Sequence, residues 1–108
     1  MNALRNKVQL IGHVGIDPEI KTFDSGKKIV SLTLATNETH KNEGGEKVED
    51  TQWHRLIAFG KTADIIEKYV TKGKEIAIEG KLTYRNFEDK NKEKRSVTEV
   101  IVNELLLL

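Results

Sequence analysis

The segment from Thr51 to Lys61 combines aromatic and basic side chains at a spacing that suits contact with nucleic acid. Read as a strand, it places Trp53, Arg55 and Phe59 on one face, because alternate side chains of a strand point to the same side. A flat ring can stack on a base and a guanidinium can neutralise a phosphate, so this face could bind a nucleic-acid strand. The alternative is that the two rings fill the core while Arg55 extends its charged end to water.

A second segment repeats this combination and favours the binding interpretation. Residues 75–87 alternate as a strand that places Lys81, Arg85 and Phe87 on one face. An aromatic residue therefore lies on a basic face in two separate strands. The opposite face of the second segment carries Ile76, Ile78, Leu82 and Tyr84.

The sequence lacks the residue arrangements that catalysis or metal binding would need. The three histidines, His13, His40 and His54, lack the spacing of metal ligands, and His13 and His54 fall on separate predicted strands with no carboxylate in phase. The chain has no Cys, which excludes disulfides, thiolate catalysis and Cys-based zinc sites. We therefore expect a protein that is not an enzyme and needs no metal or cofactor.

Length and charge describe one small domain with a heavily charged surface. The chain has 108 residues and a formal net charge of +1, so residues 1–108 fit a single domain. The charges are unevenly distributed: residues 37–52 hold five acids against two lysines, and residues 53–74 hold five basic residues against two acids. Local charge decides where a polyanion can approach.

The sequence also bears on where the protein resides. No apolar run approaches the roughly 20 residues that a membrane-spanning helix needs. The N-terminus lacks the apolar centre of a signal peptide and leads directly into a strand pattern. We therefore expect a cytosolic protein without a membrane segment.

Alternating apolar residues predict a protein made mostly of strands. The clearest alternation is that of Val30, Leu32 and Leu34, which we expect to point inward. Gly12 and Gly15 interrupt the first strand, which is typical of a sharp bend. The predicted strands are 7–14, 19–23, 28–36, 51–59, 75–87 and 95–102, and the one predicted helix is 61–72.

Three segments lie outside this pattern. Residues 37–50 are polar and acidic, which is typical either of a mobile functional loop or of a solvated loop tip. Residues 88–94 read as a charged turn. Leu105 to Leu108 would form an exposed hydrophobic patch if nothing covered them, so we expect them to pack on the domain or on another subunit.

The order of these elements predicts the fold. Short strands with one helix before the last two strands indicate an all-β protein, a β-barrel with one helix. In the OB-fold, a five-stranded Greek-key barrel, the helix lies between the third and fourth strands. The predicted order, with the helix before the last two strands, fits this fold.

Taken together, the segments resemble bacterial single-stranded DNA-binding proteins of the homotetrameric OB-fold type. The resemblance covers essentially the whole chain, and the order of its motifs makes it specific. The matching segments are Asn6-Lys7-Val8, Gly12, Gly15-Ile16-Asp17-Pro18-Glu19, Leu34-Ala35-Thr36, Thr51-Gln52-Trp53-His54-Arg55, Phe59-Gly60-Lys61, Tyr69-Val70-Thr71-Lys72-Gly73, Ile78-Glu79-Gly80-Lys81-Leu82 and Thr98-Glu99-Val100-Ile101-Val102-Asn103.

The resemblance implies roles for individual side chains. Trp53, Phe59 and Phe87 would stack on bases, with weaker stacking at Phe87, which stands where the family often has Trp. His40 also stands where Trp is common, and an imidazole can stack or, when protonated, contact a phosphate. His54 matches a position at the contact between subunits. The basic residues implied to contact the DNA backbone are Lys7, Arg55, Lys61, Lys72, Lys74 and Arg85.

The resemblance further implies a homotetramer that protects single-stranded DNA during replication, recombination and repair in the bacterial cytoplasm, associated with the nucleoid. Family members commonly continue into a flexible linker and an acidic tail that recruits replication and repair proteins. This chain stops at Leu108, so we expect a short form without the tail or a chain trimmed to its binding domain. The residues themselves leave two alternatives open, namely an OB domain that binds RNA and a primosome or translation accessory module.

Overall fold

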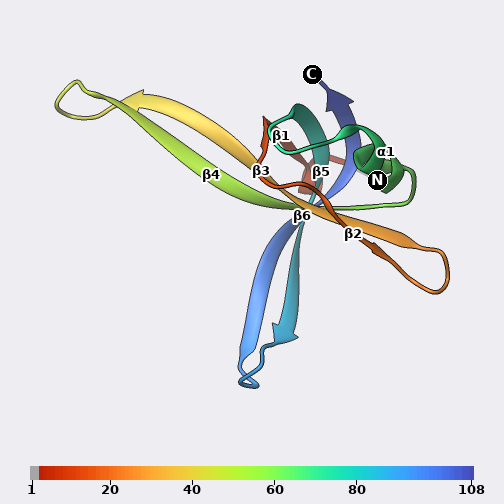
Figure 1. Cartoon of the computed structure of the whole chain (residues 1–108). Helices are drawn as coiled ribbons and strands as arrows, with labels where there is room; N and C mark the ends of the chain where they lie inside the picture. Colours follow the sequence, from red (N-terminus) through yellow and green to blue (C-terminus); the bar gives the residue numbers. More distant parts are fainter. Residues whose placement is uncertain (1–2) are drawn as a thin grey trace.

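Six strands and one α-helix follow one another in the order that the alternation predicts (Figure 1). The structure is a computed structural model that describes residues 3–108. The helix ends earlier than predicted, at Tyr69, and Val70 follows it as the C-cap. The elements are a short 3-10 helix at Ala3–Asn6, β1 at Val8–Val14, β2 at Glu19–Thr22, β3 at Lys28–Lys41, β4 at Lys47–Phe59, α1 at Gly60–Tyr69, β5 at Glu75–Glu88 and β6 at Lys94–Leu107.

Five of the strands close into a barrel. The hydrogen-bonded order is β1-β5-β6-β4-β3, and pairing of β1 with β3 completes the circle. All neighbours are antiparallel except β4 and β6, which run parallel where Leu56 faces Val100. The short β2 stands outside the circle and pairs only with β3. The predicted OB-fold is confirmed.

The barrel core comes from the inward residues of each strand. Val30, Leu32 and Leu34 of β3 are buried as predicted. The helix α1 contributes Ala63 and Ile66, and its contacts are with β3, β4 and β6. The remaining buried apolar residues are Val14, Leu56, Ala58, Val70, Ile76, Ile78, Val100 and Val102.

Closure between β1 and β3 depends on a residue without a side chain. A Cβ at Gly12 would collide with the backbone carbonyl of Ala35 on β3. The neighbouring pair across this junction is His13 and Ala35. Gly12 therefore allows the two strands to approach closely enough to close the barrel.

Three hairpins project from the barrel as arms (Figure 1). They are the β2–β3 arm, the β3–β4 arm and the β5–β6 arm. The prediction of a loop over residues 37–50 was wrong, because β3 runs to Lys41 and β4 begins at Lys47. Polar pairs such as Glu38 with Asp50 continue the ladder outside the barrel. Both faces of this ribbon meet water, so it lacks the apolar alternation that reveals a strand.

The C-terminal leucines extend β6 rather than forming a separate tail. Leu105 packs partly against the core, as predicted, and Leu106 pairs with Ala77 of β5. Leu106, Leu107 and Leu108 are exposed in the isolated chain. Their packing on another subunit stays a prediction. None of the helices in residues 3–108 has the length and apolar character to cross a membrane.

Candidate nucleic-acid interface

The predicted binding strand has an exposed face and a buried face. Leu56 and Ala58 point into the core, whereas Trp53 and Phe59 on the other side are 63% and 46% exposed. Arg55 lies between the two rings and is exposed as well. The alternative in which these rings fill the core is therefore wrong.

Strand register extends this face across the sheet into a groove. Ile57 of β4 is paired on one side with Ser31 of β3 and on the other with Ile101 of β6. The groove has a volume of about 760 Å³. It is lined by Glu19, Lys21, Phe23, Ile29, Ser31, Arg55, Ile57, Phe59, Thr83, Tyr84, Arg85, Asn86, Glu99 and Ile101.

Trp53 lies just beyond this groove on the same face of β4, and glycine makes room for its ring. A Cβ at Gly15 would overlap the Cζ3 and Cε3 atoms of the indole and would also crowd Thr33 Oγ1. The backbone N–H of Gly15 donates to the carbonyl of Thr33, 2.9 Å away. The indole therefore has one side against the chain near Gly15 and remains more than half exposed.

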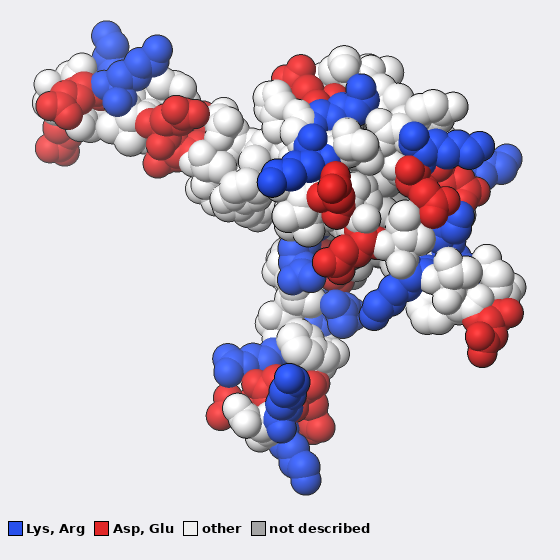
Figure 2. All heavy atoms as spheres, in the orientation of Figure 1, with Lys and Arg blue, Asp and Glu red and all other residues white. Residues whose placement is uncertain are grey.

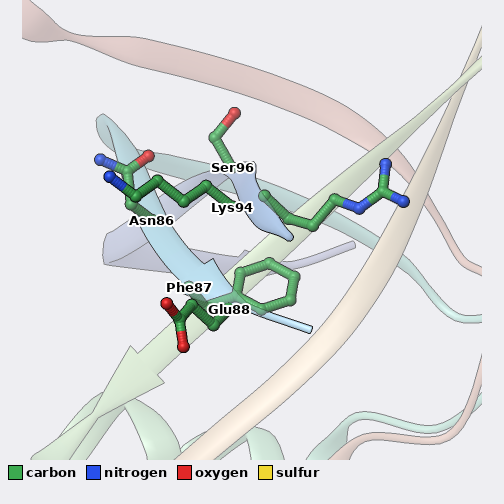
Figure 3. A pocket seen from close by; sticks show the side chains of 6 residues that line it. Asn86, Phe87, Glu88, Lys94 and Ser96 are labelled. Carbon is green, nitrogen blue, oxygen red and sulfur yellow. The ribbon is translucent and has the colours of Figure 1, made fainter. Parts of the chain in front are cut away.

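A second hollow continues from the groove onto the β5–β6 arm. It has a volume of about 440 Å³ and brings together Arg55, Arg85, Phe87 and Arg95 with Asp89, Ser96 and Val97. The outer part of the arm carries a further hollow, where side chains of both strands gather, among them Phe87, Lys94 and Ser96 (Figure 3). Arg55 and Arg85 line both the groove and the second hollow, and Phe87, Arg95 and Ser96 line both hollows of the arm, so the three follow one another as a path from the groove onto the arm.

The turn of the β5–β6 arm is ordered by Asp89. Its Oδ1 accepts the backbone N–H groups of Asn91 and Glu93 at 2.9 and 3.0 Å, and its Oδ2 accepts Nε of Arg95 at 3.0 Å. The hydrogen bond from Arg95, followed by the backbone bond from Glu93, lowers the pKa of Asp89 below its ordinary value. Arg95 is thus tied to the turn while it lines the path beside Phe87.

Charge is mixed rather than uniformly positive over the molecule. Figure 2 shows acidic and basic side chains side by side at the ends of the β3–β4 and β5–β6 arms. Within residues 3–108, Arg55 has no ion-pair partner, whereas Arg85 is paired with Glu99. Arg55 is therefore the cation that β4 brings to the groove without an acidic partner. The described residues contain no cluster of three or more side chains suited to hold a metal ion.

Comparison with known families gives a clear assignment. The model of the single-strand binding protein family matches residues 5–108. The chain belongs to this family.

Individual relatives support the assignment over nearly the whole chain. Single-stranded DNA-binding protein 1 of Chlorobaculum tepidum is 44% identical over 104 residues, which cover 95% of this chain and 64% of the relative. The single-stranded DNA-binding protein of Rickettsia typhi is 46% identical over 109 residues, with 95% of this chain and 72% of the relative covered. The chain thus spans less than two thirds of the first relative's length.

Solved structures show the same barrel. The Plasmodium falciparum SSB in complex with ssDNA is similar over 100% of this chain and 99% of its own, with a TM-score of 0.88 and 34% identity. A deletion mutant of the single-stranded DNA binding protein from Thermus aquaticus matches with a TM-score of 0.82 and 30% identity, over 95% of this chain and 50% of its own.

The structure gathers only some of the residues that the family resemblance assigned to DNA. Arg55, Phe59 and Arg85 line the groove, and Phe87 lines the adjoining hollow. Trp53 shares the face of β4. Four predicted basic residues do not line the groove or the arm hollows, namely Lys7, Lys61, Lys72 and Lys74.

Two of the outlying predicted residues have local partners. Nζ of Lys7 lies 2.6 Å from a carboxylate oxygen of Glu79 on β5. Nδ1 of His40 lies 3.3 Å from Oδ2 of Asp50, across the β3–β4 arm. Each side chain must exchange or share its acidic partner before it can contact a phosphate.

His54 points to the side of β4 opposite Trp53 and is partly buried. Its Nε2 lies 2.8 Å from Oγ1 of Thr36, at hydrogen-bonding distance. It is therefore separated from the groove by the sheet, which is compatible with the predicted role at a subunit contact.

Sequence reasoning missed Phe23, Tyr84 and Arg95 as components of this surface. Phe23 follows Lys21 at the two-residue spacing that identified the other basic-aromatic faces, so the same signal was present in a shorter strand. Tyr84 continues the apolar face of β5 past the barrel and is 68% exposed. The sequence predicts Arg95 only as the first residue of a strand, and its pairing with Phe87 places it beside the path.

Proposed function

We propose that this chain binds single-stranded DNA without sequence preference, using the groove and the arm hollows as a continuous path. The observation that carries the proposal is the exposed face of β4, where Arg55 lies between Trp53 and Phe59 beside the groove. The solved relative from Plasmodium falciparum, similar over the whole chain, is a complex with ssDNA. That relationship supports the same ligand here.

Stacking on aromatic side chains supplies the first part of the affinity. Trp53, Phe59 and Phe87 each offer a ring to a base, and each stacked base contributes roughly 1–3 kcal/mol. Any base has a flat face, so this contribution does not depend on sequence. Duplex DNA keeps its bases stacked on one another, so it cannot use these rings and binds more weakly.

Phosphate contacts supply the second part. We assign Arg55 and Arg85 to phosphates within the groove, and Lys7, Lys61, Lys72, Lys74 and His40 to phosphates outside it. Each neutralised phosphate releases counterions, which lowers the slope of log affinity against log salt by about 0.7 on single strands.

Assembly into a homotetramer follows from the family, and we place His54 at a contact between subunits. One DNA strand that passes over several barrels gains avidity without any new contact. Sedimentation equilibrium of the chain and of His54→Ala tests this. A wild-type monomer at all accessible concentrations would contradict the assembly.

We place the protein in the bacterial cytoplasm, associated with the nucleoid, where it protects single-stranded DNA in replication, recombination and repair. It acts by binding and not by catalysis. Incubation with nucleotides or DNA and a divalent metal should give no turnover, and measurable hydrolysis by the pure protein would contradict this.

The alternative is an OB module that binds RNA or serves a primosome. Every groove contact named above is to a base face or a phosphate, and neither reads the ribose 2′-hydroxyl. Titration with poly-dT and poly-U therefore separates the two ligands. Tighter binding of poly-dT supports the DNA assignment, and tighter binding of poly-U would favour the alternative.

The first experiment follows the fluorescence of Trp53, which is the only Trp in the chain. Poly-dT should quench it strongly, duplex DNA should not, and the affinity should fall with added salt. An unchanged signal when the folded protein is titrated with an excess of poly-dT would remove Trp53 from the binding surface.

A further inference from the structure

A carboxylate lies in the floor of the groove that we assign to a polyanion. Glu99 of β6 is 3% exposed and is the only buried charged residue among residues 4–108. It lines the groove together with Arg55 and Arg85. A negative charge at this place repels phosphates, and burying it costs free energy unless it is paired. We therefore expect Glu99 to have a function that offsets these two costs.

Arg85 holds this carboxylate with a two-point contact. Nε of Arg85 lies 3.2 Å from Oε1 of Glu99, and an Nη atom lies 3.4 Å from Oε2. The contact is diagonal in the sheet, because Thr83 is the residue directly opposite Glu99 and Val97 the one opposite Arg85. Hydrogen bonding to Glu99 also raises the pKa of Arg85 above its ordinary value, and an arginine carries its charge at any ordinary pH.

The same guanidinium lies over a predicted base-binding ring. The Cζ atom of Arg85 lies 5.7 Å from the ring centroid of Phe87, two residues along the same face of β5. This distance falls within the range of a cation–π contact. Glu99, Arg85 and Phe87 thus form a row in which the buried carboxylate holds the arginine and the arginine contacts the ring.

We propose that Glu99 is a positioning residue for DNA binding, which fixes Arg85 and, through it, the ring of Phe87; this rests on the proposed binding of single-stranded DNA. An unpaired arginine on an exposed strand samples many rotamers, whereas the two-point contact holds it in one. A guanidinium has five N–H donors, and the contact with Glu99 uses two of them. The other three remain available to a phosphate or a base edge.

This role predicts an effect opposite in sign to simple electrostatics. Glu99→Gln removes a negative charge from the binding surface, so repulsion alone predicts tighter binding. The amide offers one acceptor in place of two and sets an NH₂ group against the guanidinium, so positioning predicts weaker binding. We expect a loss of about three- to tenfold in affinity for an oligo-dT strand.

Making Glu99→Gln in a chain that already lacks Arg85 separates a positioning role from an effect on general stability. In an Arg85→Met chain there is no guanidinium left to position, so Glu99→Gln should leave affinity unchanged or raise it. Arg85→Lys keeps the charge but lacks the planar fork, and it should reproduce the loss of Glu99→Gln. Glu104→Gln, on the exposed part of the same strand and outside the groove, is the matched control and should not change affinity.

The experiment measures oligo-dT affinity, its salt dependence and thermal unfolding for wild type, each single variant and the Arg85→Met/Glu99→Gln pair. Weaker binding by Glu99→Gln in the wild-type background, absent in the Arg85→Met background, supports the proposal. Tighter binding in both backgrounds, no change in either, or an equal loss in both would overturn it. A wild-type chain that fails to bind would overturn the proposed function itself, whereas a binding wild type with an unaltered Glu99→Gln variant overturns this inference alone.

Discussion

The indole of Trp53 lies in the space that a side chain at position 15 would fill, so its position depends on Gly15 having no side chain. The glycine gives the ring a backbone support on one side and leaves the other side to solvent. A large ring that is held but exposed is suited to stack on a base, because little side-chain freedom is lost when the base arrives.

Gly15→Ala should therefore disturb binding although Gly15 is not itself a predicted DNA contact. The new methyl displaces the indole, so the fluorescence of the free protein should change and the affinity for oligo-dT should fall. Gly44→Ala is the control, because a Cβ there meets only Asn42 Oδ1 at 3.4 Å in the turn of the β3–β4 arm. Equal spectra and affinities for the two variants would contradict the contact.

Loss of Trp53 should cost more affinity than loss of Phe87. Each removed stacking partner costs about 1–3 kcal/mol, which is about five- to 150-fold in affinity, and the larger, more exposed indole belongs at the upper end. Binding of Trp53→Ala and Phe87→Ala can be followed by anisotropy of a labelled oligo-dT. Ile65→Ala on α1, an exposed apolar residue outside the groove, is the control. Equal losses, or none at Trp53, would count against the stacking assignment.

Phe23 on the β2–β3 arm should contribute to binding although sequence reasoning passed over it. Its backbone N–H donates to the carbonyl of Lys27 at 2.8 Å, which continues the β2–β3 pairing and leaves its ring on the groove side. Phe23→Ala should weaken binding by about five-fold or more. Ile20→Ala, on the opposite face of β2, should not. A loss confined to Ile20→Ala would place the DNA on the other side of the arm.

The turn of the β5–β6 arm should loosen in acid. The folded-state pKa of Asp89 is lowered, chiefly by its hydrogen bond with Arg95, so its contribution to stability is present above the ordinary pKa of an aspartate and is lost as the pH falls through the lowered value. The amide groups of Asn91 and Glu93 should then exchange faster with solvent. Asp89→Asn should show faster exchange already at neutral pH. Exchange that does not depend on pH in this range, after correction for the intrinsic rate, would contradict the role of Asp89.

Much of the interface could be read from local sequence because it rests on the two-residue period of a strand. That period assigns Trp53, Arg55 and Phe59 to one face whatever the rest of the chain does. The buried Leu56 and Ala58 on the other face then fix which side meets water. The six strands and the helix follow from the same kind of local signal.

The length of the arms could not be predicted in this way. Residues 37–50 carry no apolar alternation, because a two-stranded ribbon outside the barrel has no buried face to specify. Its strands are held by backbone pairing, which every residue but proline can make. A polar ladder and a polar loop therefore have the same composition.

The sequence by itself determined which faces of β4 and β5 bear rings and charges, since the geometry of a strand is local. Only the tertiary structure decided which of these faces meet in one groove, because that depends on strand order and register between residues distant in the chain. Glu99 illustrates the difference. Alternation places it beside Val97 and Ile101, but its burial and its partner depend on the register of β5 against β6, which brings Arg85 next to it.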